Sequence, residues 1–538
     1  MMSGMEVVPA RFDHAVLGDR WYREGWYSER TLIDALAFGA AEHGDVPVVF
    51  VADGVETTTT PVEILRQSQE VAAGLQRLGV GVGDAVAVQL TNRLECAVAY
   101  EAVLMCGATL VPIIHIYGPS EVGFILAESG AKVLIMPARF RSVCYLDRVG
   151  EFSTIPTLQQ VVVVDAAPGE GYLAWPPLSG DQYRRPAPSA DDVAVLIYTS
   201  GTTSAPKGVQ HSHNSMLAEQ QTLPDLVSRG DDVVQLVTFP PGHIAGVGAL
   251  LRPLISGASS VFMDGWDPAT AVDLIHRHRV SATAGTPFHL EGLLDLGDTG
   301  ERLASLREFL VGAATVTEDQ GRRAAAAGIN TYRCYGSTEQ PTITAARSYD
   351  AAPARMGTDG KPMRGVTVRI VGPDGSEQAA GTDGEIVTRG PDQFIGYRDP
   401  ALNEAAFTAD GWFRTGDLGH LDTNGRLTIT DRIKDVIIRA GETISSGQVE
   451  DVLNAHPAIA EGAAVAAPHP RYGDVVAAVV VLKPGAAVDL DELRDHFAAS
   501  GLARQKTPER LAIVDALPRT SMGKVRKAEL RREHFERP

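Results

Sequence analysis

Apolar residues recur along the first 140 positions in two alternating patterns, one typical of amphipathic helices and the other typical of buried strands. Thr60, Pro61 and Glu63 form a helix-start signal, because a Thr N-cap, a Pro at the first helical position and an early acidic residue all favour initiation. The pattern predicts a helix from there to about Leu78, where the Gly-rich segment 79–84 ends it.

The alternation continues to residue 137. It predicts a strand at 85–90, a helix at 94–106, a strand at 109–113, a helix at 120–130 and a strand at 132–137. Strands that alternate with helices form parallel sheets with helices on both faces. The predicted fold class is therefore α/β, with a large N-terminal domain of parallel-rich sheets covered by helices.

The pattern changes after about residue 430. Helices at 446–454 and 490–499, with a long apolar strand at 475–482 between them, indicate a small α+β domain of roughly 100 residues. The predicted boundary lies in the segment 430–435, which gives an N-terminal domain at 1–433 and a C-terminal domain at 434–538.

Composition narrows the class of protein. A chain of 538 residues with 44% hydrophobic content can build two or more sizeable cores. A net charge of −19 argues against a broad nucleic-acid-binding surface, which needs a basic face. The apolar stretch 97–114 is interrupted by charged and helix-breaking residues, so it indicates a buried helix and strand and not a membrane span.

Cysteine usage and the first residues bear on location. The four cysteines have no metal-type spacing and no secretory framework, so we expect buried thiols in a reducing compartment. Residues 1–30 have no apolar core of signal-peptide length. We expect a cytoplasmic protein without a membrane span.

The segment "YTSGTTSAPKGV", residues 198–209, is a candidate anion site. Backbone N–H groups of a Gly/Ser/Thr loop, hydroxyls and the Lys207 ammonium can converge on a polyphosphate. The segment differs from the P-loop motif G-x-x-x-x-G-K-[ST], because Gly208 and Val209 follow the lysine. Taken alone, it could equally be a solvated turn.

This segment resembles the phosphate loop of the adenylate-forming superfamily, which includes acyl-CoA synthetases, luciferases and the adenylation domains of peptide synthetases. Similar family motifs follow in the expected order: "YGSTEQ" at 335–340, "GEIVTRG" at 384–390, "GWFRTGDLG" at 411–419, "DRIKDVIIRAGETI" at 431–444 and "PRTSMGK" at 518–524. The resemblance implies that a carboxylate attacks the α-phosphate of ATP, releasing pyrophosphate and forming an acyl-adenylate. A thiol then displaces AMP.

The resemblance assigns catalytic roles to four residues. Lys524 would bridge the carboxylate and the α-phosphate, where two anions meet and positive charge is needed. Thr338 would contact the α-phosphate, and Glu339 would help to hold Mg²⁺, which takes few protein carboxylates. His243 would lie beside the acyl group. The alternatives are a solvated lysine, an ordinary helix start at Thr338 and Glu339, and a core histidine.

The resemblance also assigns nucleotide-binding residues. The β- and γ-phosphates would lie against Thr199, Ser200, Gly201, Thr202, Thr203 and Lys207. The adenine would lie against Tyr335 and the backbone of Gly312, Ala313 and Ala314, with Gly336 and Ser337 beside it. Asp417 would accept the two ribose hydroxyls, and Arg432 would approach the ribose or a phosphate. A surface salt bridge is the alternative for Asp417 and Arg432.

Lys434 falls at the family's hinge position, and Gly441 would lie near the thiol path. The resemblance therefore implies a mobile C-terminal domain and two functional conformations, with Lys524 at the site only during adenylation. The sequence departs from the family pattern where Ser204 replaces a usual Gly, where Ser446 and Gln448 replace Pro and Glu, and where Thr315 replaces Pro.

The acid is predicted from the segment "FPPGHIAGVGAL", which begins at residue 239. It has no carboxylate, which disfavours an amino acid, because a buried ammonium needs an anionic partner. The small apolar residues 244–248 suit an aliphatic, alicyclic or aryl acid. The closest likeness is to acyl-CoA ligases of the cyclohexanecarboxylate or fatty-acid type.

The acceptor is predicted from the C-terminus, because the chain ends 14 residues after Lys524 and no carrier domain follows. We therefore expect an AMP-forming acyl-CoA ligase that uses ATP, Mg²⁺ and free CoA. An acyl-AMP ligase that delivers to a separate carrier protein, a luciferase-like enzyme and a catalytically inactive nucleotide-binding relative are the alternatives. The last of these would be expected to lack Lys524, Glu339 or Asp417. The resemblance leaves a homodimer open as the assembly.

Overall fold

The computed structural model describes residues 14–176, 182–199, 206–226, 233–296, 300–312, 318–439, 442–500, 502–520 and 523–536. They form two compact units. Unit 1 contains the described residues up to 199 together with 206–367 and 389–412. Unit 2 contains 368–388 and the described residues from 413 onwards.

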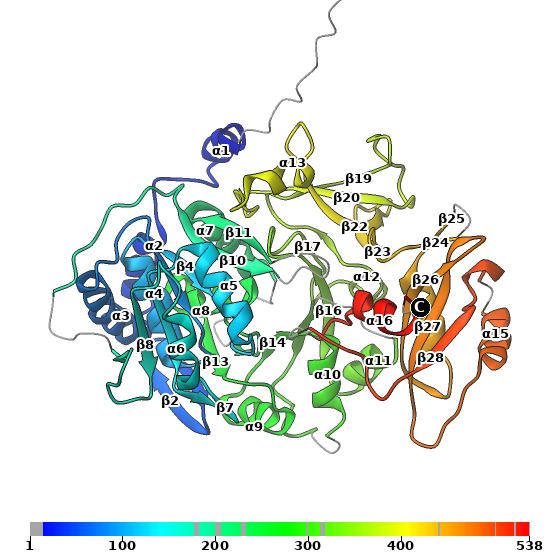
Figure 1. Cartoon of the computed structure of the whole chain (residues 1–538), viewed down its shortest axis with the longest axis horizontal. Helices are drawn as coiled ribbons and strands as arrows, with labels where there is room; N and C mark the ends of the chain where they lie inside the picture. Colours follow the sequence, from blue (N-terminus) through cyan, green and yellow to red (C-terminus); the bar gives the residue numbers. More distant parts are fainter. Residues whose placement is uncertain are drawn as a thin grey trace, which may run out of the picture. The chain divides into compact units, whose positions relative to one another are not determined.

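Two large sheets form the framework of unit 1 (Figure 1). In strand order, the first described sheet has β18 (Lys361–Pro362), β17 (Thr344–Ala345), β16 (Asn330–Tyr335), β15 (Glu308–Val311), β14 (Ala282–Gly285), β12 (Val234–Val237), β13 (Ser259–Met263), β1 (Val48–Ala52) and β2 (Val55–Thr59). The second has β21 (Gly396–Tyr397), β11 (Lys207–Ser212), β10 (Val193–Thr199), β4 (Thr109–Pro112), β3 (Ala85–Val88), β5 (Val133–Pro137), β8 (Gln160–Val164) and β9 (Leu173–Ala174). A short hairpin joins β6 (Arg139–Phe140) to β7 (Val143–Cys144).

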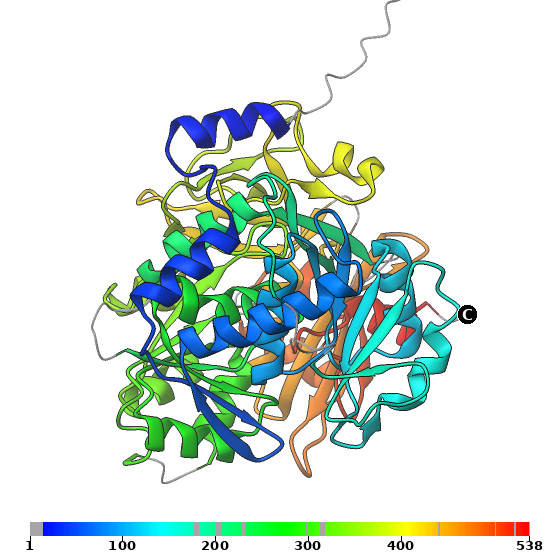
Figure 2. The same ribbon diagram turned by 90° about the vertical axis from the view of Figure 1, so that its left-hand side faces the viewer.

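The helices of unit 1 cover these sheets. They are α1 (His14–Arg23), α2 (Leu32–Glu42), α3 (Pro61–Arg77), α4 (Leu94–Met105), α5 (Pro119–Ser129), α6 (Val149–Phe152), α7 (His213–Thr222), α8 (Ile244–Ser256), α9 (Pro268–His278), α10 (Pro287–Leu294), α11 (Glu318–Ala326), α12 (Ala352–Gly357) and α13 (Asn403–Ala406). Figure 2 shows the blue helices of this group side by side, and α2, α3, α4 and α8 share one large apolar core with the second sheet.

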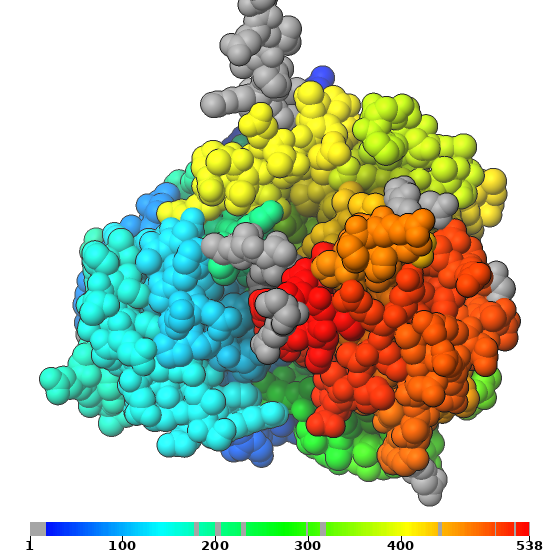
Figure 3. Space-filling view, turned by 45° about the vertical axis from the view of Figure 1, so that its right-hand side comes forward, coloured from blue at the N-terminus to red at the C-terminus, as the bar shows by residue number. Residues whose placement is uncertain are grey.

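Unit 2 contains two further sheets. The first is antiparallel where the pairing is described, in the order β19 (Thr367–Val371), β20 (Gly384–Arg389), β22 (Phe413–Leu421) and β23 (Leu427–Arg432). The second contains β25 (Glu442–Ile444), β24 (Ile437–Arg439), β27 (Gly473–Leu482), β26 (Ile459–His469) and β28 (Arg510–Ile513), with α14 (Ser446–Asn454), α15 (Leu490–Ala499) and α16 (Lys527–His534). These C-terminal elements form the orange to red surface of Figure 3.

The elements predicted from the apolar pattern are confirmed. Thr60 is the N-cap of α3 and accepts a hydrogen bond from the Glu63 N–H, and Pro61 is the first helical residue. The predicted strands and helices up to 137 appear as β3, α4, β4, α5 and β5, and most of their pairings are parallel. The α/β class is therefore confirmed for unit 1.

Two features differ from the expectations. Helix α16 was not predicted, because its short polar segment has few apolar positions. Two of the four cysteines, Cys144 and Cys334, are only partly buried, although none of the four is in a disulfide. The expected boundary at 433/434 remains a prediction. No helix among the described residues is long and apolar enough to cross a membrane.

Candidate active site

The segment predicted to bind polyphosphate connects two antiparallel strands, β10 and β11. Thr199 at the end of β10 pairs with Lys207 at the start of β11. The residues predicted to hold phosphate between them, Ser200, Gly201, Thr202 and Thr203, lie outside the described part of the chain, as does Ser204. The structure therefore shows only that the two ends of this segment are held together by a sheet in unit 1.

The motif "YGSTEQ" forms a tight turn after β16. The Ser337 N–H donates to the Gln340 carbonyl at 2.9 Å, and the Gln340 N–H donates to Ser337 Oγ at 3.2 Å. A Cβ at Gly336 would lie 1.9 Å from the Pro341 carbonyl oxygen, so only glycine fits there. Tyr335, the last residue of β16, is buried, whereas Thr338 and Glu339 are partly exposed.

Glu339 is connected to the phosphate segment through Tyr397. The Tyr397 hydroxyl donates to Glu339 Oε1 at 2.8 Å, and Lys207 Nζ lies 5.0 Å from the centre of the Tyr397 ring. Burial, and then the charge of Glu339, raise the pKa of Tyr397 above its usual value. Tyr397 therefore stays a hydrogen-bond donor at neutral pH and fixes the orientation of the Glu339 carboxylate.

His211 supports the backbone of the same turn. Its Nε2 lies 2.7 Å from the Thr338 carbonyl oxygen, and its Nδ1 lies 3.3 Å from Ser215 Oγ. Burial lowers the pKa of His211 to about 4, and the hydrogen bond to Thr338 opposes that shift. The ring is therefore neutral at pH 7, with a proton on Nε2 that it donates to Thr338.

A partly exposed glycine, Gly312, lies at the carboxyl end of the parallel strand β15, which pairs with β14 and β16. Gly312 follows β15, and its N–H donates to the Gly285 carbonyl at 3.0 Å. A Cβ on Gly312 would lie 3.3 Å from Cys334 Sγ. Ligands of open α/β sheets commonly bind at such carboxyl ends. Ala313 and Ala314 lie outside the described residues.

His243 begins the helix that the sequence analysis associated with the acid. It is the N-cap residue of α8 and is partly buried. The segment before it is tightly packed, because a Cβ at Gly242 would lie 2.5 Å from the Ile114 nitrogen. The Tyr100 hydroxyl also donates to the Pro241 carbonyl at 2.8 Å. The backbone at the start of α8 is therefore held firmly.

In unit 2, the structure brings two predicted ribose-binding residues together. Asp417 in β22 is paired across the sheet with Arg432 in β23, and Arg432 Nε donates to Asp417 Oδ1 at 2.7 Å. Asp417 is 4% exposed, whereas Arg432 is exposed. A buried carboxylate beside an exposed guanidinium can present acceptors to hydroxyls and donors to a phosphate. The salt bridge that was the alternative interpretation is present as well.

Lys434 and Lys524 are both exposed residues of unit 2. Lys434 lies in a turn between β23 and β24, in which the Asp435 and Val436 N–H groups donate to the Arg432 carbonyl. The backbone of Lys524 is bound to that of Thr520, because the Thr520 N–H donates to the Lys524 carbonyl at 2.8 Å. The Lys524 N–H donates to Thr520 Oγ1 in return. Gly441 lies outside the described residues.

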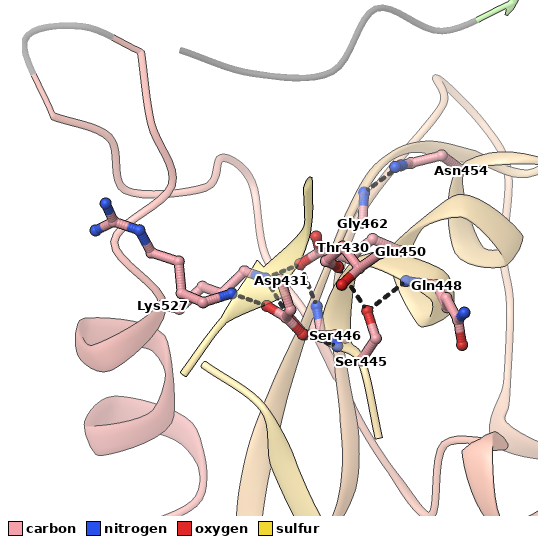
Figure 4. Close-up of polar contacts among 11 residues, drawn as sticks. Thr430, Asp431, Ser445, Ser446, Gln448, Glu450, Asn454, Gly462 and Lys527 are labelled. Carbon is pink, nitrogen blue, oxygen red and sulfur yellow. Dashed lines mark hydrogen bonds and ion pairs between the residues drawn. The ribbon is translucent and has the colours of Figure 1, made fainter. Parts of the chain in front are cut away.

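A polar network joins the end of β23 to the two helices α14 and α16 (Figure 4). Ser446 donates to Asp431 through both its N–H and its Oγ, the latter at 2.9 Å. Lys527 Nζ donates to Ser446 Oγ at 2.7 Å and forms an ion pair with Glu450 at 2.8 Å. Burial raises the pKa of Glu450, and the ammonium of Lys527 opposes that shift. The helix still begins normally, with Ser445 as its N-cap.

We expect Ser446→Pro to destabilise unit 2 by about 1–3 kcal/mol, because it removes two donors from Asp431 and one acceptor from Lys527. Proline is tolerated at the first helical position, so the backbone of α14 need not change. Hydrogen exchange of α14 amides measures the effect. Ser446→Ala keeps the N–H and should cost less. Equal protection of α14 in the wild type and in Ser446→Pro would show that the network does not stabilise the unit.

The sequence missed two residues of this site. Tyr397 binds the Glu339 carboxylate, and His211 binds the Thr338 carbonyl. Neither residue lies within the motif at 335–340. His211 and Lys207 lie in the same strand, β11. This closeness along the chain was the one sequence signal that could have placed His211 at the site. Predicted residues divide between the units: Lys207, Gly312, Tyr335, Thr338 and Glu339 belong to unit 1, whereas Asp417, Arg432, Lys434 and Lys524 belong to unit 2.

Comparisons with known proteins identify the family of the chain. Residues 37–398 match the family model of the AMP-binding enzymes, and residues 448–524 match the model of their C-terminal domain. A medium-chain fatty-acid–CoA ligase of Escherichia coli is 33% identical over 85% of this chain and 83% of its own length. A salicyl-AMP ligase / salicyl-S-ArCP synthetase of Mycobacterium tuberculosis is 32% identical over 95% of this chain and 92% of its own.

Among solved structures, the o-succinylbenzoate coenzyme A synthetase of Bacillus subtilis in complex with ATP and a magnesium ion has a TM-score of 0.79. It is 28% identical, and the similarity covers 92% of this chain and 98% of that one. The motifs, the fold and the family matches lead to one conclusion: the chain belongs to the AMP-binding enzyme family and is an adenylate-forming ligase of the acyl-CoA synthetase type.

Proposed function

We propose that this ligase activates a carboxylic acid with ATP and transfers the acyl group to CoA. In the first step a carboxylate oxygen attacks the α-phosphorus, the bond to the bridging oxygen breaks, and pyrophosphate leaves with its electron pair. In the second step the CoA thiolate attacks the acyl carbonyl and AMP leaves. The observation that supports this proposal best is the chain of contacts from Lys207 through Tyr397 to Glu339, beside Thr338.

The residues of unit 1 have distinct roles in this proposal. Lys207 and Thr338 supply a cation and a hydroxyl to the phosphates, and their orientation is set by the sheet and by His211. Tyr335 and Gly312 lie against the adenine. His243 lies beside the reacting carboxylate. In the site, these fixed dipoles and charges replace the water molecules that hydrate the carboxylate and the phosphates in solution.

Glu339 suits a magnesium ion. It is a partly exposed carboxylate, and Tyr397 binds its Oε1. No cluster of three metal-ligating side chains exists among the described residues. An Mg²⁺ ion at Glu339 would be held by one or two carboxylates, waters and substrate phosphates. When bound, Mg²⁺ would neutralise charge on the phosphate oxygens.

We expect Glu339→Gln to raise the Mg²⁺ concentration that gives half-maximal activity by at least about tenfold, since even outer-shell partners of a metal commonly contribute 10- to 100-fold. Tyr397→Phe should give a smaller increase, because it removes one hydrogen bond and keeps the carboxylate. Acid-dependent exchange of pyrophosphate into ATP measures both effects. The exposed Glu404→Gln is the matched control. An unchanged Mg²⁺ requirement in Glu339→Gln would exclude this residue as a ligand.

The residues of unit 2 complete the proposed site. Asp417 and Arg432 contact the ribose, and Lys524 approaches the carboxylate and the α-phosphate during adenylation. A change of backbone conformation at Lys434 then removes Lys524, and Gly441 lies near the thiol path in the second conformation. A hinge residue needs to absorb only a backbone change, which its exposed turn permits.

The acceptor distinguishes the proposal from its main alternative. The name of the Mycobacterium tuberculosis relative includes an acyl-AMP ligase activity, so delivery to a separate carrier protein is the second candidate. Pyrophosphate exchange that depends on the acid tests the adenylation step for either candidate. Thiol-dependent release of AMP with free CoA supports the first, and AMP release that ignores CoA supports the second. No exchange with any acid would contradict both.

A further inference from the structure

One face of α8 keeps accessible surface although the helix lies inside unit 1. Ala245 is exposed, and Ala249 and Arg252 are partly exposed. Their spacing of four and three residues places them on the same face of the helix. The opposite face has Val247, Leu250, Leu251 and Leu254, all of them buried in the core shared with α2, α3 and α4. A strip of accessible surface therefore extends along α8 from the turn that follows His243 to Arg252.

Arg252 at the end of this strip lacks an ionic partner. Its Nη1 donates to Gln235 Oε1 at 3.1 Å, whereas its Nε is buried without a hydrogen-bond partner. No carboxylate of a described residue lies within 4.0 Å of its guanidinium. Burial lowers the pKa of Arg252 to about 10, and the nearby Glu219 opposes that shift. The side chain is therefore a cation at neutral pH. A buried polar atom such as this Nε ordinarily has a hydrogen-bond partner, because an unpaired one is costly.

Two further polar side chains near Gly248 have unused acceptors. Glu219 and Gln220 are each 4% exposed, and Glu219 Oε2 and Gln220 Oε1 are buried without partners. Gln220 Nε2 donates to the Gly248 carbonyl, and Thr342 Oγ1 donates to Glu219 Oε1, both at 3.2 Å. Gly248 thus lies between this polar group and the strip on α8.

Glu219 is the acidic group whose charge acts on Arg252. Burial, and then the charge of Asp392, raise the pKa of Glu219, which disfavours its ionised form. Asp392 itself is buried and accepts a hydrogen bond from Gln340 at 2.9 Å. The Arg252 Nε therefore has no acceptor among the described residues. An oxygen acceptor of a ligand would supply one.

We propose that Arg252 binds an oxygen acceptor, a carboxylate or a carbonyl, in the part of the acyl group remote from the reacting carboxylate. This inference rests on the proposed function, in which His243 lies beside the reacting end of the acid. The rise of an α-helix, about 1.5 Å per residue, puts Arg252 about 13 Å along α8 from His243. The substrate class is then an extended acid with a second polar group near its far end, and the wall of the acid site is apolar only near His243.

Acyl sulfamoyladenosines, unreactive mimics of acyl-adenylates, test this inference without turnover. The probes are pairs with straight chains of eight to twelve carbons, one member ending in a methyl group and the other in a carboxylate or a methyl ketone. Calorimetry should show the wild type binding the oxygen-bearing member about 10- to 100-fold more tightly at one chain length, as for a charge-assisted hydrogen bond. Arg252→Met should abolish the difference. The carboxylate and ketone arms distinguish the two acceptors.

Controls separate recognition from structure. Arg66→Met makes the same change at an exposed arginine of α3 and should keep the preference. Without ligand, Arg252→Met should leave Tm unchanged or raise it, because methionine removes a buried Nε that has no hydrogen-bond partner. A lower Tm together with equal binding of each pair by the wild type would make Arg252 a structural residue and overturn the inference. Equal binding alone overturns it and leaves the proposed function intact. Failure of every probe to bind would overturn both.

Discussion

Replacing Lys524 with Ala lowers the rate of acyl-adenylate formation by about 100- to 1000-fold, the usual effect of removing a group that stabilises developing charge. Two anions meet in this step, and the exposed Lys524 is the cation that we propose to lie between them. Pre-steady-state release of pyrophosphate measures the rate. Transfer from separately supplied acyl-adenylate to CoA should change little, because the proposal has Lys524 away from the site in that step.

The matched control for this prediction is Lys361→Ala, which removes an exposed lysine of unit 1 that has no assigned role. Its rates should equal those of the wild type in both steps. A Lys524→Ala variant that loses both steps equally would contradict the proposed change of conformation. A variant that loses neither would exclude Lys524 from catalysis.

Replacing Asp417 with Ala raises the KM for ATP by about 100-fold or more, because two hydrogen bonds to a charged acceptor contribute about 1.5–3 kcal/mol each. The change also leaves the Arg432 guanidinium without the carboxylate that binds its Nε at 2.7 Å. The kcat at saturating ATP should fall less than kcat/KM, since the ribose is remote from the reacting atoms. Steady-state kinetics over a range of ATP concentrations measures the effect.

Arg432→Lys separates the two contributions to this effect. This variant keeps a cation beside Asp417 but loses the several N–H donors of the planar guanidinium. The KM for ATP should therefore rise by a smaller factor than in Asp417→Ala. The wild type should bind 2′-deoxy-ATP more weakly than ATP, whereas Asp417→Ala should bind the two nucleotides about equally. Equal losses in both proteins would show that Asp417 does not contact the ribose.

The apolar pattern was sufficient to predict most elements of unit 1, because parallel strands and their covering helices alternate with strong periodicity. Helix α3 shows this best, since its N-cap at Thr60 and its Pro61 are local signals that tertiary contacts do not override. Helix α16 was missed for the opposite reason, because Leu530 is its one buried residue and packing against β26 stabilises it.

The site was predictable only where its residues lie in contiguous motifs. The turn at Gly336 is encoded locally, by a glycine that a close backbone approach requires. Tyr397 is separated from Glu339 by 58 positions, and long-range contacts bring it there: the pairing of β21 with β11 and the hydrogen bond from the Phe394 N–H to the Glu339 carbonyl. The contacts of Ser446 with Asp431 and Lys527 likewise depend on how α14 and α16 pack. Spacing along the chain holds no information about such contacts.

Formation of an acyl-adenylate and transfer of its acyl group to CoA can both be detected by mass spectrometry of the products. The assay contains ATP, Mg²⁺ and a panel of short, medium, cyclic, aryl and ω-functionalised acids, each with and without CoA. We expect acyl-CoA and AMP from one class of acid when CoA is present, and acyl-adenylate when CoA is absent. Acyl-adenylate that accumulates whether or not CoA is present, or no product from any acid, would contradict the proposed function.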